Sequence, residues 1–363
     1  MFATFAGGYS RKPLPAQPDR LGQAEADLRA GRIDEAAYRA VADGFVREVL
    51  DEMATVALGI VGDGGVRAAD RAVPWIRGLE GLQAGERIAL PGGEVVTRPV
   101  TTGAVRWHEP VLVRDWTFAR EASELIVKQT MLGPYTLAAL AEPADRTRRA
   151  ALASAFGEAQ GEEVRALAAA GCSMVEIDEP SATRIDGEAE WAVFRSAQER
   201  LTAGLDLTDP PHLSLGLWGG AIDAAGHTAL IDLPYRSYLV DVLAGPSAWR
   251  FIDAVPAERG IIAGAGEATT DRLDETEVLV WAMAWAAQNG RGSGRVGVAP
   301  NGSLASIDRH FAHRKCLRLG EAVRIARMGP LQDVAEALEE LPIQSRMPEL
   351  RTLAAAVLDA RGP

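Results

Sequence analysis

Short apolar runs alternate with longer amphipathic stretches along most of the chain. The apolar runs are bounded by glycine, proline or polar residues and are too short for helices, so they predict strands covered on both faces. The predicted core strands are residues 2–6, 58–62, 125–131, 174–178, 213–217, 239–243, 260–265 and 296–299. Strands that alternate with helices pair in parallel, and this number of them predicts one (β/α)₈ barrel, an α/β fold.

Two segments depart from this rhythm. Residues 85–107 hold Pro91, Gly92 and Gly93 between two β-prone runs, which predicts a β-hairpin inserted after the second strand. Residues 331–363 carry two short helical patterns, which predict an extension packed on the outside of the barrel. We therefore expect one barrel domain over residues 1–330, followed by that helical extension.

Composition excludes several classes of protein. A total of 38 basic and 50 acidic residues gives a net charge of −12, which disfavours nucleic acid as a partner. The two cysteines, Cys172 and Cys316, exclude a disulfide framework and fit a reducing compartment. Residues 1–11 do not resemble a secretory signal, and no apolar run is long enough for a membrane span. We expect a cytoplasmic protein that acts on a small molecule. The sequence leaves open whether it forms a homo-oligomer.

The chemistry of such a barrel belongs to the loops after its strands, because the carboxyl ends of all strands share one mouth. The candidate residues in these loops are Tyr9, Arg11, Asp63, Arg67, Tyr135, Asp178, Glu179, Trp218, Glu267 and Asn301. Asp178 ends an apolar strand, where a carboxylate is poorly placed for solvent. We interpret Asp178 as a catalytic group that faces the pocket; the alternative is a structural acid that caps a loop.

The other candidates have two interpretations each. Glu267 follows the seventh strand as an acid or base, or forms a salt bridge. Arg11 and Arg67 each have the fork that binds a carboxylate or phosphate, although one of them pairs instead with Asp63 or Asp70. Trp218 is either a wall for a flat ligand or a filler of empty space.

For the remaining candidates the structural alternative weighs at least as much. The Tyr135 hydroxyl either reaches the pocket or packs, and Glu179 either binds the substrate or braces loops. Asn301 is an amide donor to a ligand or a loop stabiliser. Tyr9 is a further candidate for substrate binding because it lies in the first of these loops.

Five segments of the sequence together resemble one enzyme family. In chain order they read GGYSRKP, GIVGDGGVRAAD, LGPYTLA, VEIDEP and APNGSL. They resemble the catalytic domain of cobalamin-independent methionine synthase, with matches from about residue 5 to residue 325. The resemblance implies transfer of a methyl group from a folate or corrinoid-type donor, and an Asp178 that contacts the amino group of the substrate.

The sequence departs from this family at the zinc site. The family binds zinc through a His-x-Cys at the end of the fifth strand, a Glu after the sixth and a Cys after the eighth. Here the corresponding positions hold Gly216, Trp218 and Gly302, and Ala244-Gly245-Pro246 after the sixth strand contains no acid. Catalytic zinc needs about three N, S or O ligands, so we expect no zinc and no tightly bound cofactor. Gly65 also replaces the Glu of the family's DGE segment.

His212 is the one histidine near the fifth strand, and its register decides whether a metal ligand survives. Pro210 and Pro211 precede it, and a central strand does not run through two prolines. His212 should therefore begin the strand, at the floor of the barrel, roughly 15–20 Å from Asp178.

Three functions follow as hypotheses. The first is methyl or one-carbon transfer, or carbon–sulfur chemistry, without the family zinc. The second is a metal-independent lyase or decarboxylase of the uroporphyrinogen decarboxylase type, which works with acids and arginines. The third is a ligand-binding barrel without catalysis, which a pocket plugged by Trp218 would favour.

Overall fold

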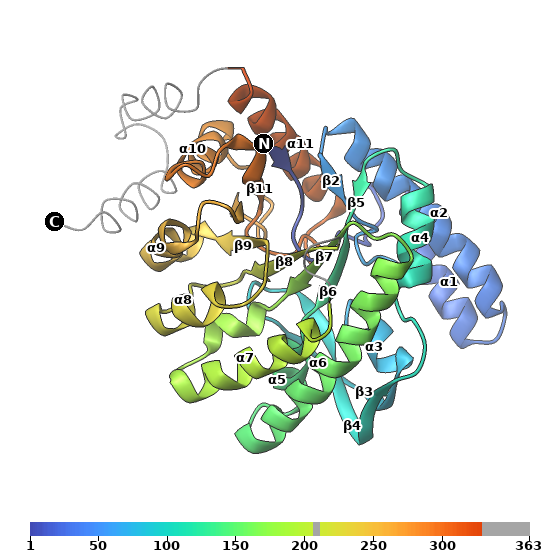
Figure 1. The fold of residues 1–363 in the computed structure, drawn as a ribbon. Coiled ribbons are helices and arrows are strands. Elements are labelled where there is room, and N and C mark those ends of the chain that lie inside the picture. Colours follow the sequence, from blue (N-terminus) through green and yellow to red (C-terminus); the bar gives the residue numbers. More distant parts are fainter. Residues whose placement is uncertain (206–210, 329–363) are drawn as a thin grey trace.

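The structure, a computed structural model, describes residues 1–205 and 211–328 and places parallel strands at the centre of a ring of helices (Figure 1). The strands are β1 Phe2–Ala3, β2 Ile60–Val61, β3 Leu79–Ala89, β4 Val95–Trp107, β5 Ile126–Val127, β6 Gln129–Leu132, β7 Met174–Asp178, β8 His212–Leu217, β9 Ser237–Asp241, β10 Gly260–Gly266 and β11 Val296–Pro300. The predicted extension at residues 331–363 lies outside the described residues.

Helices follow most of the strands and cover the outside of the sheet (Figure 1). Several begin at an aspartate whose side chain accepts a backbone N–H, as Asp34 does from Ala37 at 2.8 Å. The α-helices are α1 Arg20–Arg29, α2 Glu35–Thr55, α3 Val73–Gly78, α4 Val113–Glu121, α5 Pro134–Ala141, α6 Arg146–Ala169, α7 Glu188–Thr202, α8 Ala224–Ile231, α9 Pro246–Ala254, α10 Thr276–Ala286 and α11 Arg309–Ala326.

The parallel strands form a curled sheet. Seven of them lie in the order β1-β11-β10-β9-β8-β7-β6, and β2 and β5 form a separate parallel pair. Hydrogen bonds from Gly59 N to Ala3 O (3.0 Å) and from Lys128 N to Val61 O (2.8 Å) link that pair to its neighbours. The α/β alternation predicted from the sequence is confirmed, and every residue of β7 and β10 is buried, as in strands covered on both faces.

Two differences from the predicted strand boundaries bear on the site. The third predicted strand, 125–131, is interrupted at Lys128, because its amide turns to β2 while its side chain enters the core. The sixth ends at Asp241 instead of residue 243, since residues 242–244 form a 3₁₀ turn. The fifth begins at His212, as expected from the prolines before it.

Strands β3 and β4 form an antiparallel pair that is longer than the predicted hairpin at 85–107. It lies in the chain between β2 and β5, and its register shifts twice. Asp70 fixes the pair to the sheet, because its Oδ2 accepts hydrogen bonds from Thr97 N (2.9 Å) and Thr97 Oγ1 (2.7 Å). The turn that joins the two strands, residues 90–94, is called the hairpin tip below.

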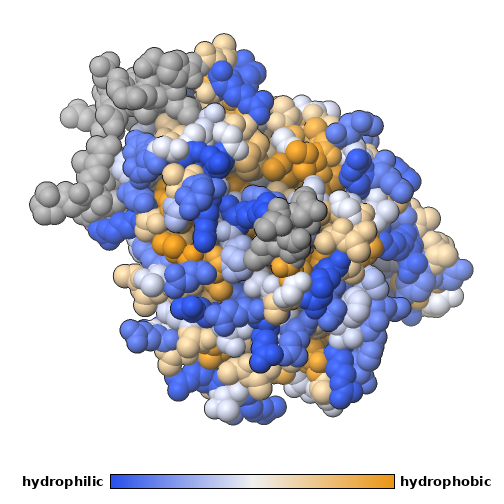
Figure 2. Space-filling view, in the orientation of Figure 1, coloured by the Kyte–Doolittle hydropathy of each residue, from blue (hydrophilic) through white to orange (hydrophobic). Residues whose placement is uncertain are grey.

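The surface in Figure 2 intersperses hydrophilic and hydrophobic residues over the face shown. Among the large apolar side chains, Ile126 and Leu317 are exposed, at 56% and 49%. Within residues 1–205 and 211–328, no helix is long and apolar enough to cross a membrane.

Candidate active site

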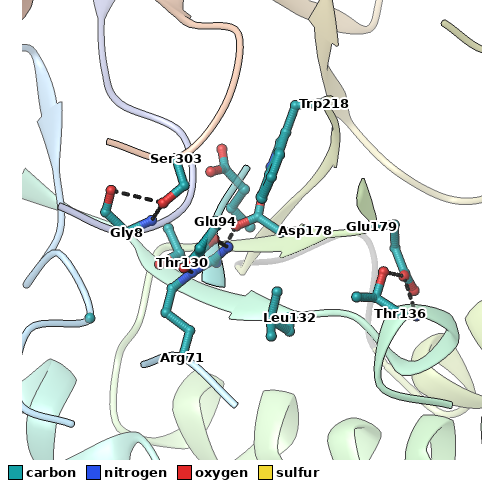
Figure 3. Close-up of polar contacts among 12 residues, drawn as sticks. Gly8, Arg71, Glu94, Thr130, Leu132, Thr136, Asp178, Glu179, Trp218 and Ser303 are labelled. Carbon is teal, nitrogen blue, oxygen red and sulfur yellow. Dashed lines mark hydrogen bonds and ion pairs between the residues drawn. The ribbon is translucent and has the colours of Figure 1, made fainter. Parts of the chain in front are cut away.

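Asp178 ends β7 at the carboxyl edge of the sheet, the side called the mouth below. Its side chain is fully buried. Oδ2 accepts a hydrogen bond from Arg71 Nη1 at 2.5 Å, and Oδ1 accepts one from Trp218 Nε1 at 2.9 Å (Figure 3). Asp178 therefore lies at the mouth with both carboxylate oxygens bonded to neighbouring side chains, and an arginine balances its charge.

Arg71 joins Asp178 to the hairpin tip. Its Nε and Nη2 donate to the two carboxylate oxygens of Glu94 at 3.0 and 2.7 Å, while Nη1 donates to Asp178 (Figure 3). The side chains of Arg71 and Glu94 are 4% and 2% exposed, so this is a buried network. The two carboxylates raise the pKa of Arg71 and keep it charged.

Glycines make room for this network. A Cβ on Gly65 would lie 2.9 Å from Arg71 Cγ, and a Cβ on Gly216 would overlap Asp178 Oδ1. Gly65 stands where the resembling family has glutamate, and Gly216 stands at one of its zinc-ligand positions. The absence of a side chain at these two glycines thus leaves the space that Arg71 and Asp178 fill.

A second ion pair lies deeper in the sheet and involves Glu176, two residues before Asp178 in β7. Lys128 Nζ donates to Glu176 Oε1 at 2.8 Å and to the carbonyl of Phe5 at 2.7 Å, and both charged side chains are fully buried. Burial raises the pKa of Glu176 to about 7 and also raises the pKa of Asp178, although Lys128 and Arg71 oppose these shifts. Glu176 and Asp178 thus lie two residues apart in β7, and the negative charge of Asp178 adds to the raised pKa of Glu176.

The other side of the mouth holds Asp241, at the end of β9. The sequence analysis found no acid after the sixth strand because it placed the strand end two residues too late. Asp241 is 4% exposed, and its Oδ1 accepts from Asn301 Nδ2 (3.1 Å) and Leu243 N (3.1 Å). Burial raises the pKa of Asp241 to about 7, because these neutral donors offset only part of the desolvation.

Asn301 and Glu267 are both occupied within their loops. Asn301 donates to Asp241, and its Oδ1 accepts from Ala268 N at 2.9 Å. Glu267 Oε1 accepts from Thr269 N and Thr269 Oγ1, both at 2.7 Å. The negative charge of Glu267 contributes to the raised pKa of Asp241, so these residues share one side of the mouth.

Trp218 fills space beneath the hairpin tip. The side chain is fully buried, and the guanidinium carbon of Arg71 lies 5.7 Å from its ring centre. A Cβ on Gly92 of the tip would lie 3.1 Å from Trp218 Cε3, and a Cβ on Gly302 would lie 3.6 Å from the same atom. The indole thus packs against Gly92, Gly216 and Gly302, the last two of which are positions that the resemblance matches to zinc ligands.

The residues at this region do not fit a zinc ion. Gly216 and Gly302 have no ligating atom, the indole N–H of Trp218 is a donor only, and Asp241 is the one acid of the set. Within the described part of the chain, no group of three or more His, Cys, Asp or Glu side chains is arranged to hold a metal ion.

Tyr9 and Arg11 lie at the rim of the mouth. The Tyr9 hydroxyl donates to Glu52 Oε2 of α2 at 3.2 Å, and Arg11 pairs with Glu25 of α1. Both residues line a cavity of about 380 Å³ that also touches Arg71 and Glu94. The two side chains therefore border a cavity at the mouth while their polar groups bind neighbouring helices.

Asp63 and Arg67 line a different cavity, of about 360 Å³, which Arg71 also reaches. Arg67 pairs with Asp43, lies 3.4 Å from Asp115, and is 3.8 Å from Asp63. The predicted contact of an arginine with Asp63 is present but long. Asp70, the other predicted partner, binds the hairpin instead.

Tyr135 and Glu179 point away from Asp178. The Tyr135 hydroxyl donates to Glu190 Oε1 of α7 at 2.9 Å. Figure 3 shows Glu179 turned toward Thr136 and apart from Arg71 and Asp178. Glu179 accepts four hydrogen bonds, from Tyr135 N, Thr136 N, Thr136 Oγ1 and Gln198 Nε2. Its contacts are those of a brace for the start of α5, the alternative named for it.

His212 lies at the other end of the sheet. It pairs with Met174 in the register, whereas Asp178 pairs with Gly216 four residues further on. At about 3.3 Å per residue the two side chains are separated by roughly 13 Å along the strands. His212 Nε2 lies 2.8 Å from Ser237 Oγ, and burial lowers its pKa to about 4, so it is neutral at pH 7.

Sequence reasoning missed Arg71, Glu94 and Asp241. Gly65 was a signal for Arg71, because a glycine in place of a larger polar residue leaves space that another side chain must fill. Glu94 follows a Pro-Gly-Gly turn with no motif of its own. Asp241 was hidden by the boundary error at the sixth strand.

Comparison with known proteins agrees with this architecture. A family model described as the catalytic domain of cobalamin-independent synthase matches residues 15–200, just over half of the chain. A 5-methyltetrahydropteroyltriglutamate–homocysteine methyltransferase of Streptomyces griseus is 31% identical over 167 residues, which cover 46% of this chain and 22% of that protein. A methionine synthase of Sulfurisphaera tokodaii is 25% identical over 191 residues, covering 52% of this chain and 55% of that protein. The aligned part thus spans only about a fifth to a half of these relatives.

Solved structures extend the likeness to most of the chain at the level of the fold. A B12-independent methionine synthase from Shewanella sp. W3-18-1, in complex with selenomethionine, has a TM-score of 0.69 and 17% identity, covering 90% of this chain and 97% of that one. A protein from Listeria monocytogenes described as a putative vitamin-B12 independent methionine synthase gives the same TM-score at 16% identity. The family match covers β7 and Asp178, and the chain belongs to the cobalamin-independent methionine synthase catalytic-domain family, a family of methyltransferases.

Proposed function

We propose that this protein transfers a methyl group from a methylated folate to the sulfur of a small thiol amino acid such as homocysteine, without zinc. The observation that carries the proposal is the buried Asp178 at the mouth, within the segment that the family model matches. A relative is named for transfer from a methyltetrahydropteroyl donor to homocysteine. The family description excludes cobalamin, which favours a folate over a corrinoid donor.

Without zinc, another group must remove the proton of the thiol. Asp241 is the best placed base, because it borders the former metal region and burial raises its pKa to about 7. Such a carboxylate accepts a proton from a thiol of pKa about 8.5 at moderate cost. The thiolate then attacks the methyl carbon and forms a sulfur–carbon bond. The bond between the methyl carbon and the folate nitrogen breaks, its electron pair stays on the nitrogen, and the proton on Asp241 passes to that nitrogen. Glu267 is the alternative base on the same side of the mouth.

The proposal includes a closed barrel of eight parallel strands, with β5 and β6 counted as one. The links from Gly59 to Ala3 and from Lys128 to Val61 support this closure. Asp178 and Asp241 then end strands on either side of β8 and share one mouth, where a donor and an acceptor could meet.

Specific observations also favour the two other hypotheses, a binding protein and a metal-independent lyase or decarboxylase. Trp218 and the hairpin tip fill the mouth, which favours a binding protein without catalysis. The buried Arg71–Asp178 pair supplies the acid and arginine of a metal-independent lyase or decarboxylase.

The experiment is a methyl-transfer assay with purified protein, L-homocysteine and 5-methyltetrahydrofolate with a polyglutamate tail, in the presence of a strong chelator. We expect methionine to form and its rate to be independent of added zinc. Zinc-dependent turnover would refute the metal-free mechanism. No turnover, with release of carbon dioxide or a small product from an amino acid, would favour the lyase. Ligand binding without product would favour the binding protein.

A further inference from the structure

The hairpin tip reaches across the mouth and contacts the loops after three distant strands. Gly92 lies against Trp218 and Gly219, which follow β8. Ser306, beyond β11, donates its hydroxyl to the carbonyl of Gly93 at 2.9 Å, and a Cβ on Gly93 would meet Thr269 beyond β10. Gly92 and Gly93 both have φ near +80°, a conformation that glycine adopts without strain. The tip thus covers the mouth through small residues and few polar contacts.

Glu94 carries the main polar contact between the tip and the mouth. Its two oxygens accept from Nε and Nη2 of Arg71, the paired geometry in which an arginine binds a carboxylate (Figure 3). In the described residues Glu94 forms this pair with Arg71 alone among cationic side chains. The arrangement is that of an arginine holding the carboxylate of a ligand, with a side chain of the protein in the ligand's place.

The charges of this cluster identify the ligand that would replace Glu94. Arg71, Glu94 and Asp178 together carry one excess negative charge when ionised. An amino acid in zwitterionic form would give its carboxylate to Arg71 and its ammonium group to Asp178, and the cluster would become neutral. A cavity of about 380 Å³ already touches Arg71 and Glu94, a volume suited to a small ligand.

We propose that Arg71 is the residue that binds the substrate carboxylate, and that Glu94 occupies its fork until an amino acid displaces it and the hairpin tip lifts. The inference rests on the proposed function in one respect, that the acceptor is an amino acid. Removing the Glu94 carboxylate should then raise the affinity for carboxylate ligands. In the ligand-free wild type Glu94 occupies the Arg71 guanidinium most of the time, and the variant no longer has this competitor.

The test is calorimetric titration with two probes that differ only in the carboxylate, L-methionine and 3-methylthiopropylamine. Glu94→Gln should tighten binding of L-methionine by about tenfold or more and change binding of the amine by less than about threefold. In the double variant Arg71→Met/Glu94→Gln the two probes should bind alike. Glu86→Gln, an exposed position on the same hairpin whose partner is Arg98, is the matched control and should bind as the wild type does.

Hydrogen exchange on the unaltered protein provides a second measurement if a variant fails to fold. Saturating L-methionine should speed exchange of the amides in residues 90–94, since the tip leaves Trp218 and Ser306. Unchanged affinity for L-methionine in folded Glu94→Gln would overturn the proposal, as would slower or equal exchange at the tip. Neither measurement uses a methyl donor, so discrimination for the carboxylate without methyl transfer would refute the proposed function and leave the Arg71 site standing.

Discussion

The two sides of the mouth bury their carboxylates in different ways. On one side Asp178 shares Arg71 with Glu94 and receives the indole N–H of Trp218. On the other side Asp241 accepts hydrogen bonds from the Asn301 amide and from the backbone N–H of Leu243, and no cation is among the groups that shift its pKa. The first side is held by full charges, and the second is held by neutral dipoles.

This difference separates two tasks. A carboxylate fixed by an arginine and a tryptophan has a defined position and suits the binding of a charged group. A carboxylate held by neutral donors in a buried site has a pKa near neutrality and suits proton transfer. We therefore assign substrate binding to the Arg71 side of the mouth and proton transfer to the Asp241 side, and four predictions test this division.

The largest effect should come from removing the cation. Arg71→Met leaves Glu94 and Asp178 buried without a positive partner, so we expect the free energy of unfolding to fall by about 3–5 kcal/mol. Urea denaturation measures this change. Arg71→Met/Glu94→Gln should recover a large part of the loss, and Arg98→Met, on the outer part of the hairpin, should have little effect. Equal loss in the single and double variants would contradict a charge-based role for Arg71.

Asp178→Asn should reduce methyl transfer strongly. The change keeps the shape of the side chain but removes the charge that holds a substrate ammonium group. We expect kcat/KM to fall by about 30- to 1,000-fold, or on the order of 2–4 kcal/mol. His212→Ala, at the opposite end of the sheet, should leave kcat/KM within about twofold. If the histidine variant were inactive and the asparagine variant active, the assignment of the mouth would be wrong.

Gly216→Ala tests whether the space beside Asp178 is as tight as the contacts indicate. Its Cβ would overlap Asp178 Oδ1, so the carboxylate must shift. We expect a loss of about 1–3 kcal/mol in the free energy of unfolding, together with weaker substrate binding. Gly44→Ala in α2 is the matched control, because its Cβ would meet open space, and it should be neutral or slightly stabilising. Equal stability of both variants would show that the Asp178 carboxylate moves aside without cost, contrary to this prediction.

Asp241→Asn should change the pH dependence of stability. Burial raises the pKa of Asp241 to about 7, so between about pH 4 and pH 7 the folded protein holds a proton that the unfolded chain has released. The free energy of unfolding therefore falls as pH rises through this range, by up to about 1.4 kcal/mol per pH unit for this group. Asparagine removes the contribution, so the stability of the variant relative to the wild type should rise by up to about 4 kcal/mol between pH 4 and pH 8.

The measurement is urea denaturation of both proteins at pH 5, 6, 7 and 8. The difference between them should shrink toward low pH, where both side chains are neutral. Asp51→Asn, on the exposed surface of α2, is the control and should give a constant difference. A variant that is less stable than the wild type at every pH would mean that Asp241 is ionised in the folded protein.

Adjacent residues show how far the sequence predicted this site. Asp178 was expected at the carboxyl end of a strand and ends β7 there, while Glu179 was weighed between substrate and loop and accepts four hydrogen bonds, three of them from the start of α5. Alternation along a strand separates two neighbours onto opposite faces, so the sequence could assign their directions. It could not assign their partners, because these come from other elements.

The sequence by itself determined the order of strands and helices, the end of the sheet at which polar residues gather, the start of β8 at His212, and the absence of ligating side-chain atoms at Gly216 and Gly302. Each of these depends on local periodicity, on proline geometry or on which atoms a side chain possesses. Only the tertiary structure decided that Arg71 meets Glu94 and Asp178, which lie 23 and 107 residues further along the chain. That meeting depends on how the sheet curls and where the hairpin folds back, and a long flexible side chain carries no local signal of the partner that will neutralise it.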